Sequence, residues 1–392
     1  MPDFTKVIKR GRPVPGTVST VTSDAFRYAH AHHDEIVWMS QNTNHLVPPE
    51  VIREAVEKAL HERRYEGYPM ASGDPELLEA IEKDFGLGGQ RPFLTGGGTE
   101  SLYMTTRALL GPGDEVIVSD PSYLIIHRFI ELCGAKPMPI DIYAPPFRLA
   151  SDRVQKAVGP RTRMILLIDP LNPLGSGYPR EEVRAIAEIA HDRHLTLIDD
   201  VTYRDFSDGH ALAAEWAPEE TVTIWSVSKN CGLAGLRIGG FFARPELLGK
   251  IGRFNTNDLG VNVLAQAAAL AAIRTKPKWI GAVVKQTRAN CTRIRDVVAG
   301  VPGASLPVYP SRANMMVIDI QPTGVTPDAV QEEMLRRHGV FVRSGNYLSP
   351  THGNKFVRVS FSNPPKDIER FAAAFPVAMK SLGAKAPMAR AA

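Results

Sequence analysis

The chain has 392 residues, a formal net charge of +4 and 44% hydrophobic residues, an ordinary composition for a protein large enough to form two domains. Its basic residues are spread along the chain rather than gathered into a stripe, which argues against nucleic acid as a partner. The lack of a leader pattern, of a long apolar run and of paired cysteines predicts a cytoplasmic protein with neither a membrane span nor a metal site.

Short apolar strand patterns alternate with helical patterns from about residue 92 onward. The glycines before Thr99 lead into a helix that ends near Leu110, and another helix starts at Pro179 with acidic residues in its first turn. Strands are expected over 115–118, 164–168, 195–198, 221–225 and 238–243, with further helices over 261–273 and 276–298. This alternation is typical of β-α units, so we expect an α/β fold with a mostly parallel sheet.

The rhythm changes after Pro310 and predicts a small α+β domain. Its strands are expected over 315–320, 340–343 and 356–361, with helices over 327–338 and from Lys366, and an N-terminal helix from Pro49 to Arg63 is expected to complete it. We therefore divide the chain into an N-terminal arm (1–48), a helix that packs with the small domain (49–66), a large domain (67–300) and the small domain (301–392).

One lysine lies in a distinctive run that extends from Ser226 to Gly239. Ser226 precedes Lys229 by three residues, and Arg237 follows Lys229 by eight. A lysine amine that is held uncharged can form a Schiff base with an aldehyde. The hydroxyl and the guanidinium on either side can bind one phosphate dianion. The run therefore indicates a cofactor that carries both an aldehyde and a phosphate.

Polar residues follow several strand patterns, where the carboxyl ends of parallel strands bind ligands. Gly98 and Thr99 open a helix, whose free N–H groups and dipole favour a phosphate. The others are Tyr123 in the run 120–123, Asn172 in 169–175, and Asp199, Asp200 and Tyr203 in 199–203. Taken singly, each motif has a simpler interpretation: a solvated loop for Lys229, a turn for the glycines and for the Asn-Pro pair, core packing for Tyr123, and helix capping for Asp199 more than for Asp200.

Together these motifs resemble the class I/II aminotransferases, which are fold-type I pyridoxal-phosphate enzymes, over most of the chain from Tyr68 to Arg358. The resemblance implies a seven-stranded, mostly parallel sheet flanked by helices, as in aspartate aminotransferase, plus a smaller α+β domain. It also implies three catalytic residues. Lys229 would form the internal aldimine and move the proton at Cα, Asp200 would hold the ring nitrogen, and Tyr123 would cover the ring face.

The resemblance further implies how the rest of pyridoxal 5'-phosphate is bound. Asn172 and Tyr203 would contact the phenolate oxygen. The phosphate ligands within one subunit would be Gly98, Thr99, Ser226 and Arg237. Tyr68 resembles the tyrosine that family members lend to the phosphate of the neighbouring subunit, which implies a homodimer with shared active sites.

Arg358, between apolar strand neighbours, resembles the family arginine that grips the substrate α-carboxylate. Asn172 and Asn42 are the other expected substrate contacts. Asn42 lies in the segment 41–45, where family members often carry a substrate-covering glycine, and Leu174 replaces the threonine of the usual Asn-Pro-Thr-Gly motif. Because the segment 41–45 usually lines the pocket for the substrate side chain, the resemblance does not define what this pocket binds.

Two residues bear on the substrate side chain. The run from Gly232 to Arg237 and the strand 339–343 resemble the histidinol-phosphate aminotransferase branch, which makes Arg343 a candidate for binding a second anionic group. Asp258 lies where family members contact the distal end of the substrate from the other subunit, so it would instead select a cationic side chain.

The implied activity is transfer of an amino group from an L-amino acid to a 2-oxo acid by a ping-pong route. An alternative keeps the cofactor but changes the reaction to decarboxylation, β- or γ-elimination, cyclisation or oxidation. A third interpretation is a regulator that uses this fold as a sensor. Such regulators carry an added DNA-binding domain, for which the chain leaves no room before Pro49.

Overall fold

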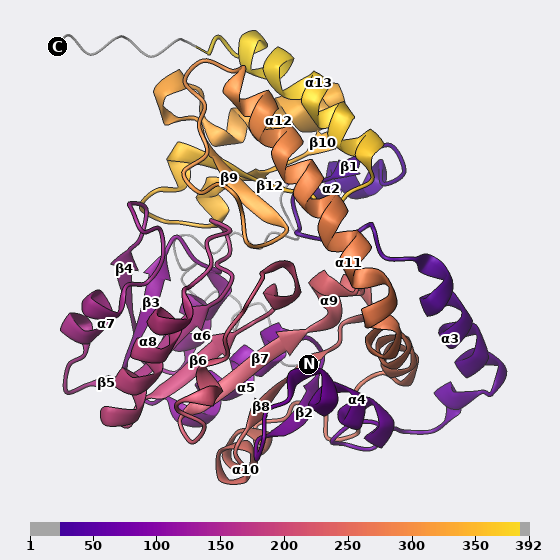
Figure 1. Ribbon diagram of the computed structural model, residues 1–392, viewed down its shortest axis with the longest axis vertical. Coiled ribbons are helices and arrows are strands. Elements are labelled where there is room, and N and C mark those ends of the chain that lie inside the picture. The colour runs from indigo at the N-terminus through magenta and orange to yellow at the C-terminus, as the bar shows by residue number, and fades with distance from the viewer. Residues whose placement is uncertain (1–23, 385–392) are drawn as a thin grey trace, which may run out of the picture.

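A seven-stranded sheet forms the centre of the larger domain in the computed structural model, which describes residues 24–384 (Figure 1). The strand order is β2-β8-β7-β6-β5-β3-β4. Strand β8 runs antiparallel to its neighbours β2 and β7, and the other neighbouring pairs are parallel. The strands are β2 (Arg91–Thr95), β3 (Glu115–Asp120), β4 (Lys136–Asp141), β5 (Thr162–Ile168), β6 (Thr196–Asp200), β7 (Thr221–Ser226) and β8 (Gly239–Ala243). The predicted α/β class and mostly parallel sheet are confirmed.

Helices cover the sheet because its central strands are apolar on both faces. Residues 164–168 of β5 and all of β7 are buried, which is the pattern of parallel strands covered by crossover helices. The helices of this domain are α4 (Pro75–Phe85), α5 (Gly98–Leu109), α6 (Ile125–Leu132), α7 (Ser151–Ala157), α8 (Arg180–Asp192), α9 (Val227–Asn230) and α10 (Pro245–Gly252).

Helix α11 (Val263–Ala299) joins the two domains as one continuous helix of 37 residues (Figure 1). Its first half buries Ala265 and Ala269 in the core of the large domain, and its second half buries Ile294 in the core of the small one. The sequence indicated two helices that break before Pro277. Proline removes one backbone hydrogen bond, but buried side chains on both sides of it keep the helix continuous.

The small domain contains a three-stranded antiparallel sheet in the order β11-β12-β9. Its elements are β9 (Met315–Asp319), α12 (Pro327–His338), β11 (Arg343–Ser344), β12 (Phe356–Ser360) and α13 (Pro365–Ser381). A parallel pair, β1 (Val37–Trp38) with β10 (Val340–Phe341), and helix α2 (Asp24–Ala31) add to it. The predicted smaller domain is therefore present.

One predicted packing arrangement is wrong. Helix α3 (Pro49–His61) was expected to complete the small domain, but its Ile52 and Val56 pack against the core of the large domain, next to α11. Strand β1 and helix α2 complete the small domain instead, because β1 forms backbone hydrogen bonds with β10. Residues 1–23 of the predicted arm and 385–392 of the predicted small domain lie outside the described residues.

Side chains connect the two domains beside the carboxyl end of β4. The hydroxyl of Tyr143 donates to Asp319 Oδ2 at 2.6 Å, and His352 Nε2 lies 2.9 Å from Asp141 Oδ1. The rings of Tyr143 and His352 stack with centroids 5.0 Å apart. Residues of the large domain thereby fix the small domain over one end of the sheet.

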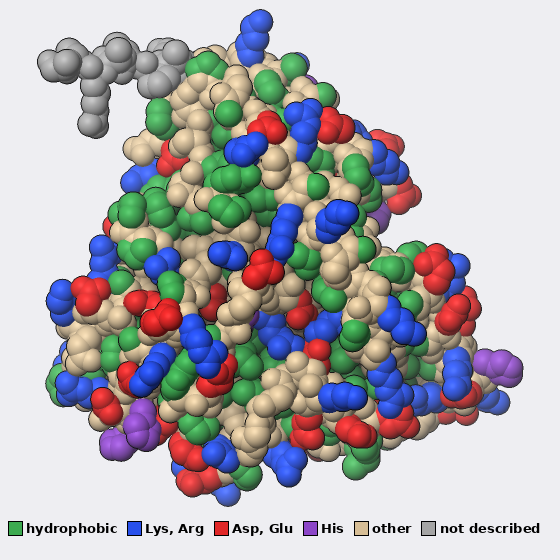
Figure 2. Space-filling model, viewed as in Figure 1, with side chains coloured by type: hydrophobic (Ala, Val, Ile, Leu, Met, Phe, Trp, Pro, Cys, Tyr) green, Lys and Arg blue, Asp and Glu red, His purple; other side chains and the backbone are tan. Residues whose placement is uncertain are grey.

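The surface carries both signs of charge. Figure 2 shows Lys and Arg interspersed with Asp and Glu on the face that it presents, without a stripe of one sign. Within residues 24–384, no helix combines the length and the apolar character that a membrane crossing needs.

Replacing Asn290 of α11 tests how the long helix stabilises the small domain. Its amide nitrogen donates to the backbone oxygens of Phe361 and Asn363, both at 2.8 Å. Asn290→Ala leaves these buried oxygens unpaired, so we expect the free energy of unfolding to fall by about 2–3 kcal/mol in urea titrations. Lys285→Ala, an exposed change on the same helix, should stay within about 0.5 kcal/mol of the parent. Equal values for the two variants would contradict this account.

Candidate active site

Lys229 lies on α9, a single helical turn that begins directly after β7. Its amine Nζ donates to the backbone oxygen of Gln41 at 2.7 Å. Burial, together with the nearby guanidinium groups of Arg358 and Arg237, lowers the pKa of Lys229 to about 7. A substantial fraction of the amine is therefore uncharged at neutral pH, as a nucleophilic lysine requires.

The two adjacent acids at the end of β6 have different partners. Asp200 Oδ1 accepts from the backbone nitrogen of Thr202 at 3.1 Å and from its hydroxyl at 2.6 Å. Asp199 instead accepts from the backbone nitrogen of Ala213 at 2.9 Å, at the start of the short helix η3 (Ala213–Glu215). Successive strand side chains point to opposite faces. Asp199 therefore supports the far side of the sheet, as the helix-capping interpretation supposed.

Tyr203 connects Asp200 to the N-terminal segment. Its hydroxyl accepts a hydrogen bond from Asn42 Nδ2 at 2.9 Å. Burial raises the pKa of Tyr203 far above its usual value, and the charges of Arg358 and Asp200 also act on it. Asn42 has a φ of 54°, a left-handed conformation that glycine adopts freely and asparagine tolerates. The side chain of Asn42 thus occupies space beside Tyr203.

Arg358, on strand β12 of the small domain, forms a hydrogen bond with the large domain. Its Nη1 donates to Asn172 Oδ1 at 2.8 Å, and its Nη2 donates to the backbone oxygen of Ser40. Arg358 is 5% exposed, and burial lowers its pKa to about 10. Because the oxygen of Asn172 accepts from Arg358, the amide nitrogen of Asn172 is left as a donor for a ligand.

Arg343 lies beside Arg358, directly opposite it in the pairing of β11 with β12. It is 8% exposed, and its guanidinium lies 4.6 Å from the ring centroid of Phe26 and 5.0 Å from that of Tyr347. Burial, and then the charge of Arg358, lower its pKa to about 9. Within residues 24–384, neither arginine forms an ion pair with an acid. The pair therefore presents two buried positive charges without a protein counter-ion.

The N-terminus of α5 forms the other end of the site. Arg237 Nη2 donates to the backbone oxygen of Gly96 at 3.3 Å, and the hydroxyls of Thr99 and Tyr123 lie 3.1 Å apart. A Cβ on Gly97, whose φ is 105°, would lie 2.6 Å from Arg237 Nη2. Glycine is required there so that Arg237 can approach the free N–H groups of the first turn, an arrangement that suits a phosphate.

The structure places eleven of the twelve predicted site residues around this region and one elsewhere. The eleven are Asn42, Gly98, Thr99, Tyr123, Asn172, Asp200, Tyr203, Ser226, Lys229, Arg237 and Arg358. Tyr68 is 83% exposed on the protein surface, so one chain alone does not bring it to the site. Asp258 is also exposed.

Sequence reasoning missed two hydroxyl residues that support the site. Thr202 donates to Asp200 Oδ1, and Ser228 accepts from the Ser226 hydroxyl at 2.8 Å. Their positions, two residues after Asp200 and one before Lys229, were the available signals. It also missed the backbone oxygen of Gln41, which no side-chain motif encodes.

Comparisons with known proteins agree with this arrangement. The model of the family "Aminotransferase class I and II" matches residues 34–375. The aspartate/prephenate aminotransferase of Thermus thermophilus is 30% identical over 83% of this chain and 87% of its own length. The histidinol-phosphate aminotransferase 1 of Mesorhizobium japonicum is 28% identical over 91% of this chain and 94% of its own length.

Among solved structures, an aminotransferase from Mycobacterium tuberculosis superimposes with a TM-score of 0.82. It is 23% identical and covers 95% of this chain and 100% of its own, which shows that the fold is shared. The family match spans most of the chain, and the lysine, acid and arginine motifs all lie within it. The chain therefore belongs to the class I and II aminotransferase family.

Proposed function

We propose that this aminotransferase uses pyridoxal 5'-phosphate, attached at Lys229, to transfer an amino group from an L-amino acid to a 2-oxo acid. One observation carries the proposal: a lysine amine with a pKa of about 7 lies near two guanidinium groups, in a site whose buried acid is Asp200. A neutral amine suits an aldehyde, and the excess of positive charge suits a phosphate and a carboxylate.

The residues present fit this cofactor. The free N–H groups at Gly98 and Thr99, with Ser226 and Arg237, would hold the phosphate at the N-terminus of α5. Asp200 would accept from the protonated ring nitrogen. Asn172 and Tyr203 would contact the phenolate oxygen, and Tyr123 would cover the ring. With Lys229 at the aldehyde, this set would give the phosphate, the ring nitrogen, the phenolate oxygen and the ring face each a complementary group.

The bound cofactor would supply an electron sink for the bond that breaks at the substrate Cα. The protein would do the rest. Arg358 would bind the α-carboxylate and orient the substrate. Lys229 Nζ would take the proton from Cα and return it, because an amine that titrates near neutral pH can serve in both directions. Burial raises the pKa of Asp200, and the two hydrogen bonds from Thr202 oppose that shift. A protonated ring nitrogen would add the opposite charge that keeps this carboxylate ionised.

Replacing Lys229 tests the proposal directly. Lys229→Ala should bind the cofactor without fixing it covalently and should lower turnover by at least about 1,000-fold. In the parent, covalent capture of pyridoxal phosphate by the cofactor-free protein should rise with pH around a midpoint near 7, because only the uncharged amine reacts. The measurement is the visible absorbance of the protein after mixing, together with detection of a new amino acid from an added 2-oxo acid.

Lys250→Ala, an exposed change, is the control and should behave like the parent. Release of ammonia or carbon dioxide without a new amino acid would favour elimination or decarboxylation over transamination. A parent protein without any cofactor band would contradict the proposal as a whole.

We further infer that the preferred amino acid carries a second anionic group. Arg343 and Arg358 are both buried and lie side by side, and one α-carboxylate satisfies only one of them. A second carboxylate or a phosphate would neutralise Arg343. The similarity to an enzyme named for aspartate and prephenate supports this substrate class.

Replacing Arg343 should therefore change the selectivity of the enzyme among amino donors, whereas replacing Arg358 should not. Arg343→Gln should lower kcat/KM by about 10- to 100-fold for donors with a second anionic group and leave donors with neutral side chains nearly unchanged. Arg358→Gln should lower kcat/KM for all donors alike. Steady-state kinetics with aspartate, O-phosphoserine and alanine would measure this. An equal effect of Arg343→Gln on every donor would rule out the selective role.

We propose a homodimer in which Tyr68 reaches the phosphate of the partner subunit. Exposed apolar side chains gather where residues 65–70 meet 254–260, since a Cβ on Gly260 would lie only 2.5 Å from the backbone oxygen of Met70. Tyr68, Met70 and Leu259 are 83%, 59% and 47% exposed. An apolar patch of this kind supports an interface, and a second copy accounts for a tyrosine held away from its own site.

A charge placed in this patch should weaken the dimer. Leu259→Asp should shift sedimentation toward the monomer and reduce cofactor retention, because burying an unpaired carboxylate is unfavourable. Val377→Asp is the matched control, since Val377 is 55% exposed on α13, and it should sediment like the parent. Tyr68→Phe should leave the dimer intact and raise the dissociation constant of pyridoxal phosphate by about tenfold. A monomeric parent that is fully active would overturn this proposal.

A further inference from the structure

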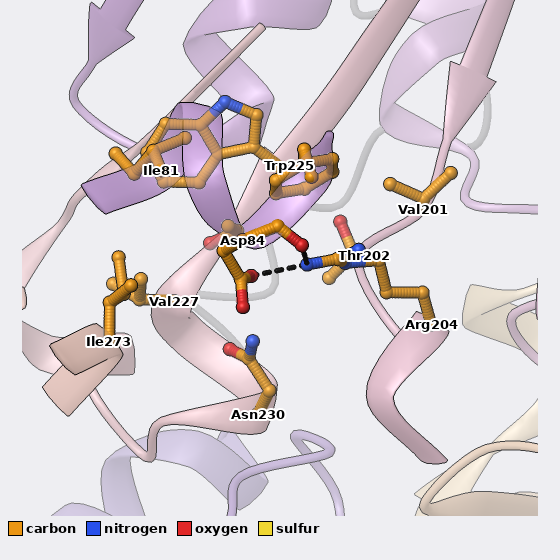
Figure 3. A pocket seen from close by; sticks show the side chains of 11 residues that line it. Ile81, Asp84, Val201, Thr202, Arg204, Trp225, Val227, Asn230 and Ile273 are labelled. Atoms are coloured by element: carbon orange, nitrogen blue, oxygen red, sulfur yellow. Dashed lines mark hydrogen bonds and ion pairs between the residues drawn. The ribbon is translucent and has the colours of Figure 1, made fainter. Parts of the chain in front are cut away.

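A buried ionic cluster lies next to the helix that carries Lys229. Lys276 of α11 donates to Asp84 Oδ2 at 2.6 Å and to Asp205 Oδ2 at 3.2 Å, and Arg204 donates to the same oxygen of Asp84. The four side chains are between 8% and 21% exposed. Figure 3 shows Asp84, Arg204 and Asn230 around a small cavity, with Arg204 directed at Asp84.

The cluster is electrostatically balanced, with two carboxylates and two cations. Burial opposes the ionisation of Asp205, but Lys276 and Arg204 outweigh it and lower the pKa of this carboxyl. Buried charges hold a fixed geometry because loss of one partner leaves the other uncompensated. The cluster joins α4, α11 and the short helix η2 (Arg204–Phe206) into one support.

Two connections lead from this support to the site. Asn230, the neighbour of Lys229, donates through its amide nitrogen to Asp205 Oδ2. Its backbone oxygen accepts from Asn44 Nδ2 at 2.9 Å, so the 41–45 segment is held as well. On the other side, Arg204 directly follows Tyr203 in the turn that starts at Asp200. The cluster thus contacts the elements that carry the amine and the acid.

Helix α9 needs such a support because it has only four residues. One helical turn gains little stability from its own hydrogen bonds. Its Ser226 N-cap fixes the start of the turn, and the Asn230 amide fixes its end. The direction of Lys229 therefore depends on contacts outside the helix.

We propose that Asn230 and Asp205 are positioning residues that orient the Lys229 amine relative to Asp200. The effect on catalysis rests on the proposed function, whereas the effect on the amine itself does not. A loosened α9 would let Nζ leave the backbone oxygen of Gln41 and reach water. The amine would then be less buried and further from Arg358 and Arg237 than in the parent.

The first experiment uses the cofactor-free protein. Acetylation of Lys229 by acetic anhydride is followed by peptide mass spectrometry across pH, and the parent should show a midpoint near 7. Asn230→Ala, which keeps all four charges of the cluster, should move the midpoint upward, toward that of a hydrated lysine. Asp205→Asn should move it in the same direction. The control is Asp208→Asn, whose exposed carboxylate pairs with Arg288 at 2.7 Å, and its midpoint should equal that of the parent.

The second experiment uses the loaded enzyme. Asn230→Ala should lower kcat by about 10- to 100-fold, as expected when a catalytic group is displaced, and leave KM for the donor within about threefold. If Asp205→Asn fails to fold, Asn230→Ala decides alone. A lower melting temperature with unchanged midpoint and kcat would overturn the proposal, because the link would then be only structural. A parent that binds no pyridoxal phosphate would refute the proposed function while the acetylation midpoints still test this inference.

Discussion

The site depends on holding several positive groups together out of water. Lys229, Arg358 and Arg343 are all buried or partly buried, and burial lowers the pKa of each. The charge of Arg358 lowers the pKa of Lys229 and of Arg343 further. Such an arrangement costs free energy unless anions enter it. The protein therefore has an electrostatic preference for anionic ligands. Burial first, and the charges of Arg358 and Arg237 second, keep part of the Lys229 amine uncharged at neutral pH.

The groups that form this arrangement come from different parts of the chain, and the fold brings them together. Arg358 comes from a strand of the small domain and Asn172 from a loop of the large one, and they meet at 2.8 Å. The domains are fixed to each other by α11 and by the contact between Tyr143 and Asp319. A displacement of one domain would separate Arg358 from Asn172, so this hydrogen bond depends on the relative position of the two domains.

The support beneath the site is also polar. The ionic cluster around Lys276 satisfies its own charges, unlike the arginine pair, and so it contributes rigidity instead of attraction for a ligand. The two groups of charges thus differ in composition: the carboxylates of the Lys276 cluster neutralise its cations, whereas Arg343 and Arg358 have no acidic partner among residues 24–384.

The sequence by itself determined the α/β class, most elements within a few residues, and the candidates Lys229 and Asp200, because strand alternation and dense local motifs are encoded in neighbouring residues. It could not place helix α3, continue α11 through Pro277, or pair Asn42 with Tyr203. Only the tertiary structure decided these features. Each depends on which surfaces meet after folding, and contacts between residues more than a hundred positions apart leave no periodicity or spacing that a local pattern can reveal.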